Sequence, residues 1–153
     1  MALFLSFRRL QGSLQRSFRL YSSSTVKEVD GKMYFFNELG KRISPWHDIP
    51  LLPLQKEPFV CQFICEIPKG ERAKFEIDKE LKDNPIVQDK DKNGDWRFLK
   101  KSGVLHNYGA IPQTWEDPVP THLIDLPGDD DPLDALDIAP TTSKKGDVYS
   151  VNF

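Results

Sequence analysis

Phe59-Val60-Cys61-Gln62-Phe63-Ile64-Cys65-Glu66-Ile67-Pro68 is an apolar, β-branched and aromatic run that also follows a proline, Pro58. Such a run predicts a buried β-strand, and its bounding prolines mark where the ladder of backbone hydrogen bonds ends. Glu66 is its one charged residue, so it lies either at the exposed end of the strand or against a polar cavity. Cys61 and Cys65 share one face of this strand but lie roughly 13 Å apart, too far for a disulfide. We expect two buried thiols in a reducing compartment.

Shorter segments on both sides of this run also predict strands, and little helical periodicity follows residue 24. Asn93-Gly94 predicts a hairpin turn between two of them, 86–88 and 96–99. Residues 43–50 contain two prolines and predict an extended edge segment. Further expected strands cover residues 33–36, 73–77, 103–112, 136–140 and 148–151. The fold class is therefore mainly β (α+β overall), with a small Greek-key, OB-like β-barrel.

Residues 1–24 differ in composition from the rest of the chain. Four arginines and six serines occur there with no acidic residue, and apolar residues recur at spacings of three and four. Such a segment is typical of an organellar transit peptide that forms an amphipathic helix, with cleavage expected near Tyr21. A basic surface helix or nucleic-acid arm is the alternative. We expect the mitochondrial matrix, with plastid or cytoplasm as alternative locations.

The charge balance of residues 25–153 argues against nucleic acid as a partner. Without the four arginines of the leader, 17 of the 21 basic residues remain beside all 23 acidic ones. No apolar run approaches the roughly 18 residues that a membrane-spanning helix needs. We therefore expect neither a nucleic-acid nor a membrane partner.

Residues 89–95 imitate the start of an EF-hand calcium loop. The twelfth position of that loop, however, is Lys100, where the motif requires a bidentate glutamate. The flanking segments also predict strands and not helices. A calcium-binding module is therefore excluded in favour of the hairpin.

The most acidic stretch is Gly128-Asp129-Asp130-Asp131-Pro132-Leu133-Asp134-Ala135. In an extended backbone, Asp129 and Asp131 share a face roughly 6.6 Å apart and Asp130 points away. A bend at Pro132 brings Asp134 to the same focus. Clustered carboxylates repel one another unless they hold a cation, and oxygen ligands suit Mg²⁺. The alternative is an acidic surface turn that binds nothing.

Several motifs between residues 33 and 149 together resemble one protein family, the soluble (family I) inorganic pyrophosphatases, in their eukaryotic and mitochondrial-like form. The motifs stand in the order of that family and occupy residues 44–51, 66–68, 73–76, 84–86, 106–109, 112–118 and 128–134. The resemblance implies Mg²⁺-dependent hydrolysis of inorganic pyrophosphate to two phosphates by metal-activated water. It implies Asp129, Asp131 and Asp134 as metal ligands, with Asp131 also acting as the general base.

The resemblance also implies how the substrate is held. Lys74 and Arg97 would bind the phosphates, and Tyr108 would donate a hydrogen bond to a phosphate oxygen. Glu66 and Glu76 would be supporting acids that line the same cavity.

The chain departs from the family pattern at three places. Asp130 stands where the family usually has Asn, and Val104 stands where some members have an active-site Tyr. The family pattern also continues past Tyr149 with more metal ligands. Residues 25–153 are thus expected to be the N-terminal part of the pyrophosphatase barrel, incomplete at its C-terminus, and the activity of this truncated chain is left open. A non-catalytic fragment that binds divalent metal or pairs with another subunit is the alternative, and a homodimer is a further expectation.

Overall fold

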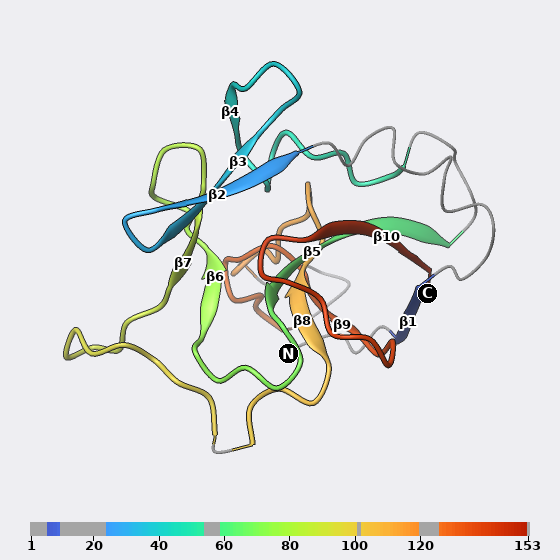
Figure 1. The fold of residues 1–153 in the computed structure, drawn as a ribbon. Helices are drawn as coiled ribbons and strands as arrows, with labels where there is room; N and C mark the ends of the chain where they lie inside the picture. Colours follow the sequence, from blue (N-terminus) through green and yellow to red (C-terminus); the bar gives the residue numbers. More distant parts are fainter. Residues whose placement is uncertain (1–5, 10–23, 54–58, 101, 120–125, 153) are drawn as a thin grey trace.

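The computed structural model describes residues 6–9, 24–53, 59–100, 102–119 and 126–152, and these residues form ten β-strands and no helix (Figure 1). The predicted mainly-β fold is thereby confirmed. Among the described residues there is accordingly no helix suited to crossing a membrane. The strands are β1 (Ser6–Arg9), β2 (Thr25–Val29), β3 (Lys32–Phe36), β4 (Arg42–Ile43), β5 (Val60–Ile67), β6 (Phe75–Ile77), β7 (Ile86–Gln88), β8 (Asn107–Ala110), β9 (Asp134–Asp137) and β10 (Val148–Asn152).

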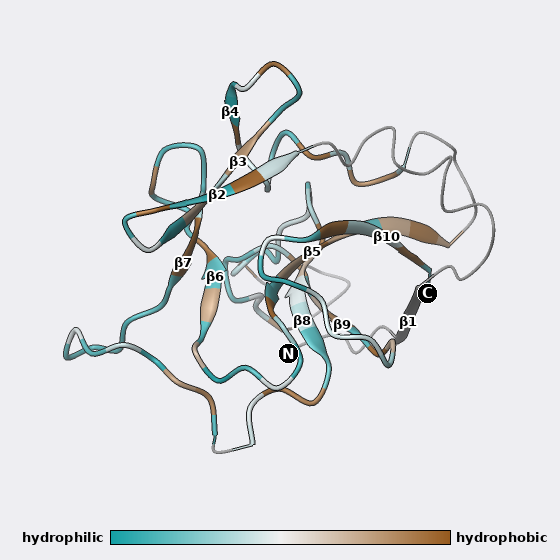
Figure 2. Ribbon diagram, in the orientation of Figure 1, coloured by the Kyte–Doolittle hydropathy of each residue, from teal (hydrophilic) through white to brown (hydrophobic). Residues whose placement is uncertain are grey.

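The first sheet is a closed ring of strands in the order β1-β10-β5-β8-β9. Strand β5 is flanked by β10 and β8, both antiparallel to it, and all eight of its residues are buried. Burial on both faces explains why its sequence is almost continuously apolar. Figure 2 shows this hydrophobic character along β5 and β10.

The second sheet has the order β2-β3-β7-β6, and β4 pairs with the end of β3 at Phe35 and Phe36. Strands β2 and β3 form a hairpin whose turn, Asp30-Gly31, has positive φ at both residues. Two residues with positive φ match the right-handed twist of the flanking strands, as in a type I′ turn. Strand β2 was not expected from the sequence.

Two apolar clusters form the core, one on each face of β5. Phe63 and both cysteines enter one cluster, and Ile64 enters the other with Phe35 and Ile86. Both cysteines are buried and neither forms a disulfide, as predicted. Burial raises the pKa of the Cys61 thiol to about 11.

Residues 43–50 correct one prediction, because the strand there ends at Ile43 and a turn follows. The Asp48 carboxylate accepts a hydrogen bond from the Ser44 N–H (2.8 Å), and the Asp48 N–H donates to the Ser44 carbonyl (2.9 Å). These bonds close the segment on itself, which an extended edge strand would not allow.

The hairpin at Asn93-Gly94 is present, and it extends away from both sheets (Figure 1). Its second arm is not a continuous strand, since only the bridges Lys90↔Trp96 and Ala73↔Phe98 form. Oδ1 of Asp91 accepts the N–H groups of Asn93 (2.8 Å) and Asp95 (3.0 Å). Asp91, in the acidic part of this segment, therefore caps the turn of the hairpin.

Within the leader, Ser6–Arg9 forms the strand β1 where the spacing predicts a helix. It pairs antiparallel with β10 and parallel with β9, and so satisfies two strand edges whose backbone groups would otherwise be open. Residues 10–23, with the expected cleavage site near Tyr21, lie outside the described residues.

Candidate active site

A cavity of about 60 Å³ lies where the end of β5, strands β6 and β8 and the loop before β9 meet. Its volume corresponds to about two water molecules. Every residue expected at the site except Arg97 lines it. The lining consists of Glu66, Lys74, Glu76, Ile77, Tyr108, Ala110, Asp129, Asp131, Pro132 and Asp134.

The acidic loop is fastened to residues 112–118 through its backbone. The N–H of Glu116 donates to the carbonyl of Asp131 (2.9 Å), and the N–H of Asp130 donates to the carbonyl of Glu116 (3.0 Å). Gly128 approaches so closely that an added Cβ would lie 2.4 Å from the backbone of Glu116. Two of the motifs recognised in the sequence are thus neighbours in space.

Asp130 has a left-handed backbone conformation, with φ of 65°. This conformation, and not an extended strand, places Asp129 and Asp131 on the cavity and leaves Asp130 off its lining. The Asp130 carboxylate accepts hydrogen bonds from Trp115 Nε1 (3.1 Å) and Lys79 Nζ (3.0 Å). Lys79 foremost, and then Trp115, lower the pKa of the Asp130 carboxyl.

Asp134 lies at the start of β9, and its carboxylate accepts a hydrogen bond from the Tyr108 hydroxyl. Burial raises the pKa of Asp134, and the nearby charges of Asp129 and Asp131 add to the effect. Burial and the neighbouring Asp134 likewise raise the pKa of Tyr108. The phenol is therefore a hydrogen-bond donor at neutral pH.

The sequence left two positions open for Glu66, the exposed end of the strand or a polar cavity. The structure places Glu66 at the polar cavity. It is only 3% exposed and accepts a hydrogen bond from the Ile77 N–H (2.8 Å). Burial foremost, with the charges of Asp134 and Glu76, holds its pKa well above the usual value.

Lys74 lies between two carboxylates, Glu76 and Asp89, and hydrogen-bonds to both. Burial lowers the pKa of Lys74, but these two carboxylates outweigh it, so the pKa is raised overall. Arg97 is half exposed and pairs with Asp89, which in turn bonds to Lys74 at the cavity. Asp89 was not expected at the site; its only sequence signal was a place in the apparent calcium loop.

The donor set of the cavity suits a hard divalent cation, because five carboxylates line it and neither His nor Cys does. As the side chains stand in the described residues, no group of three or more His, Cys, Asp or Glu is arranged to hold a metal ion. Protein donors hold several of the acids: Tyr108 holds Asp134, and Lys79 holds Asp131 at 3.2 Å. A bound cation would therefore compete with these donors for the carboxylates.

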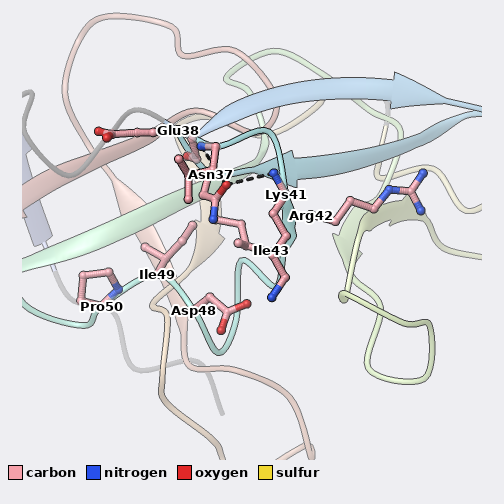
Figure 3. A pocket seen from close by; sticks show the side chains of 10 residues that line it. Asn37, Glu38, Lys41, Arg42, Ile43, Asp48, Ile49 and Pro50 are labelled. Atoms are coloured by element: carbon pink, nitrogen blue, oxygen red, sulfur yellow. Dashed lines mark hydrogen bonds between the residues drawn. The ribbon is translucent and has the colours of Figure 1, made fainter.

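A larger cavity of about 660 Å³ lies beside β4 and the turn after it (Figure 3). Two of its polar side chains serve the local backbone: Oδ1 of Asn37 accepts the N–H groups of Leu39 (3.1 Å) and Lys41 (3.0 Å), and Asp48 caps Ser44. Size alone does not make it the better candidate, because Asn37 and Asp48 already have these structural roles.

Comparison with known proteins identifies relatives of this chain. Residues 63–153 match the family model described as inorganic pyrophosphatase. An inorganic pyrophosphatase of Candida glabrata is 46% identical over 122 residues, which cover 76% of this chain and 42% of that protein. The mitochondrial inorganic pyrophosphatase of Saccharomyces cerevisiae is 39% identical over 145 residues, covering 89% of this chain and 46% of that protein.

Solved structures give the same relationship. The type I inorganic pyrophosphatase of Toxoplasma gondii superposes with a TM-score of 0.74 at 38% identity, covering 84% of this chain and 59% of the other. A truncated vacuolar soluble pyrophosphatase of Trypanosoma cruzi, in complex with PPi, gives 0.69 at 41% identity, covering 84% and 55%. The chain spans less than half the length of these curated relatives.

Proposed function

The chain belongs to the soluble (family I) inorganic pyrophosphatases, and from that premise we propose that it hydrolyses inorganic pyrophosphate to two phosphates with Mg²⁺ as cofactor. One observation carries the proposal. Lys74 and Tyr108 line the same small cavity as Asp129, Asp131 and Asp134, although they come from separate strands and loops. A tetra-anionic substrate and divalent cations need this combination of cations, a hydrogen-bond donor and carboxylates.

Lys74 and Arg97 bind the phosphate groups in this proposal. Lys74 lies at the cavity as a movable point charge, while Arg97 is a two-pronged donor linked to Lys74 through Asp89. Both are held by Asp89 in the described structure. Asp89 therefore keeps the Lys74 and Arg97 side chains oriented before the substrate arrives. The substrate must then compete with Asp89 for both side chains.

The carboxylates of Asp129, Asp131 and Asp134 hold the divalent cations. A bound cation neutralises phosphate charge and lowers the pKa of water to near neutrality. Asp131 accepts the proton of the attacking water as general base. Tyr108 donates its hydroxyl to a phosphate oxygen, and Glu66 and Glu76 orient water and cations from the wall of the cavity.

Phosphate release tests this function directly. The 153-residue chain is incubated with pyrophosphate and Mg²⁺, beside the near-isosteric variant Asp131→Asn and the control Asp95→Asn on the distant hairpin. We expect release by the wild type and by Asp95→Asn, a loss of about 100-fold or more in Asp131→Asn, and none in EDTA. Release no greater than that of Asp131→Asn would remove the proposed activity.

The second candidate is a non-catalytic protein that binds divalent cations in the same cavity or pairs with another subunit. The five carboxylates that line the cavity favour the cation-binding form of this candidate. Cation binding without phosphate release, measured on the same preparation, would select it.

We also propose delivery to the mitochondrial matrix. The relative named as mitochondrial and the basic leader support this location. Residues 1–30 fused to a fluorescent reporter provide the test, in which mitochondrial signal is expected and plastid or diffuse cytosolic signal would contradict it.

A further inference from the structure

Lys79 contacts the acidic loop from outside the cavity. Its Nζ donates to the backbone carbonyl of Asp130 (2.6 Å), lies 3.0 Å from Oδ2 of Asp130, and lies 3.2 Å from Oδ1 of Asp131. Asp131 lines the cavity, but Lys79 and Asp130 do not. The ammonium group therefore contacts Asp131 from outside the cavity lining.

Side-chain hydrogen bonds hold the backbone of the turn that carries Lys79. Oδ1 of Asp78 accepts the N–H groups of Glu80 (2.9 Å) and Leu81 (2.8 Å). The buried side chain of Asn84 donates to the carbonyls of Asp78 (3.0 Å) and Lys79 (3.2 Å). Lys79 thus projects from a turn with a fixed conformation.

Asp130 is anchored as well. Trp115 Nε1 donates to its Oδ1 (3.1 Å), which leaves Oδ2 for Lys79. A neutral Asn at this position would offer one oxygen where Asp offers two, and no charge. Asp130 can therefore accept from Trp115 and Lys79 at the same time.

On this geometry, and resting on the proposed function, we propose that Lys79 is a positioning residue for Asp131, held in place by Asp130. Its ammonium group fixes Oδ1 of Asp131 and turns Oδ2 toward the cavity. The same positive charge weakens the hold of Asp131 on a divalent cation. Lys79 thereby lowers the affinity of the site for a divalent cation and, in return, fixes the orientation of the Asp131 carboxylate.

Removing Lys79 should therefore strengthen Mn²⁺ binding and slow phosphate release. In Lys79→Met, the dissociation constant for Mn²⁺ falls by about three- to fivefold, the size of one exposed ion pair. The kcat for phosphate release falls by about tenfold because Asp131 is free to rotate, while KM changes by less than about twofold. General structural damage would weaken both properties together. Lys79→Arg, which keeps the charge and the donor, restores most of both.

The double variant Lys79→Met with Asp131→Asn tests whether Lys79 acts through Asp131. Mn²⁺ binding, followed by electron paramagnetic resonance, is compared with the charge-matched control Lys82→Met on the same loop. We expect Lys79→Met to change the Mn²⁺ dissociation constant only where Asp131 is intact, and Lys82→Met to leave it near the wild-type value. Unchanged or weaker Mn²⁺ binding in Lys79→Met, or an equal effect in the Asp131→Asn background, would overturn the proposal.

These outcomes are independent of turnover. If the wild type releases no phosphate while the Mn²⁺ cycle shows the expected coupling, the proposed hydrolysis fails and the positioning of Asp131 by Lys79 stands. Phosphate release by the wild type without that coupling gives the reverse result.

Discussion

Tyr108 and Asp134 meet across β8 and β9, where the Tyr108 hydroxyl donates to Oδ2 of Asp134. Tyr108 is opposite Leu136 and Asp134 is opposite Ala110, so the two side chains are diagonal neighbours on one face of the sheet. The strand register therefore decides that this phenol and this carboxylate share the cavity.

Tyr108→Phe should tighten divalent cation binding. The phenol occupies an oxygen that a cation would use, and its removal leaves a half-buried carboxylate without that donor. We expect the Mn²⁺ dissociation constant at pH 8 to fall by about fivefold, the net value of one hydrogen bond. Isothermal titration calorimetry measures it, with Tyr149→Phe as the control phenol outside the cavity lining. Weaker Mn²⁺ binding in Tyr108→Phe than in Tyr149→Phe would contradict this.

Stability without divalent cations should fall as pH rises above about 4.5, the usual pKa of a glutamate. The pKa of Glu66 is raised in the folded state, foremost by burial, so the folded chain retains a proton that the unfolded chain has lost. The stabilisation from this proton is complete below the usual pKa and disappears as pH rises through the raised one. Glu76 and Asp134 act in the same direction.

Glu66→Gln is the variant that isolates this effect. The amide oxygen can still accept from the Ile77 N–H, but the residue no longer titrates. Urea unfolding in EDTA from pH 4 to pH 8 should show a shallower decline for Glu66→Gln than for the wild type. Equal slopes for the two chains would show that Glu66 does not carry the pH dependence.

Asn107→Ala should lower the free energy of unfolding by about 3 kcal/mol or more. Asn107 is fully buried; its amide donates to Asp137 (3.0 Å) and the Thr141 carbonyl (2.9 Å), and its oxygen accepts from Lys69 (3.1 Å) and Ser143 (3.0 Å). The substitution leaves several buried groups without this partner. Urea unfolding measures the loss, with exposed Asn93→Ala as the control, for which we expect a change of less than about 0.5 kcal/mol. Equal losses in the two variants would refute the role of this network.

The strands with buried side chains could be predicted, because burial leaves a mark in the sequence. Strand β5 is apolar along almost its whole length and β8 falls within its predicted segment, while β3 and β10 each extend one residue beyond theirs. Strand β2 left no such mark, since four of its five residues are exposed and it is held through its backbone pairing with β3. The Asp30-Gly31 turn was the available signal for it.

The residues of the candidate site also fall into two groups, those that the sequence predicted and those that it did not. The acidic loop and the residues beside it were recognisable as short motifs. Lys79 and Asp89 were not, because each acquires its place through a partner distant in sequence: Lys79 lies 51 positions before Asp130, and Asp89 lies 15 positions after Lys74. The Lys79 contact joins the loop after β6 to the loop before β9, and the Asp89 contact follows from the register of β6 and β7. No local pattern encodes either arrangement.

Gly109→Ala should lower the free energy of unfolding by more than the difference in backbone conformational preference between Gly and Ala. Gly109 is opposite Cys65 on β5, and an added Cβ would lie 1.9 Å from the Ile64 carbonyl oxygen and 3.0 Å from the Phe63 ring. Both neighbours belong to the most buried strand and cannot retreat without disturbing the core. We expect a loss of about 3 kcal/mol or more in the free energy of unfolding.

Gly94→Ala is the matched control for Gly109→Ala. Gly94 has a positive φ of 87° but no atom within 4 Å of its added Cβ, so only backbone strain of about 1 kcal/mol applies. Urea unfolding compares the two variants, and Mn²⁺ binding is measured on whatever fraction stays folded. Because Gly109 follows Tyr108 on β8, forcing the strands apart should also weaken Mn²⁺ binding, whereas Gly94→Ala should leave it unchanged. Equal stability of the two variants would mean that Gly109 and β5 do not approach each other as closely as the structure shows.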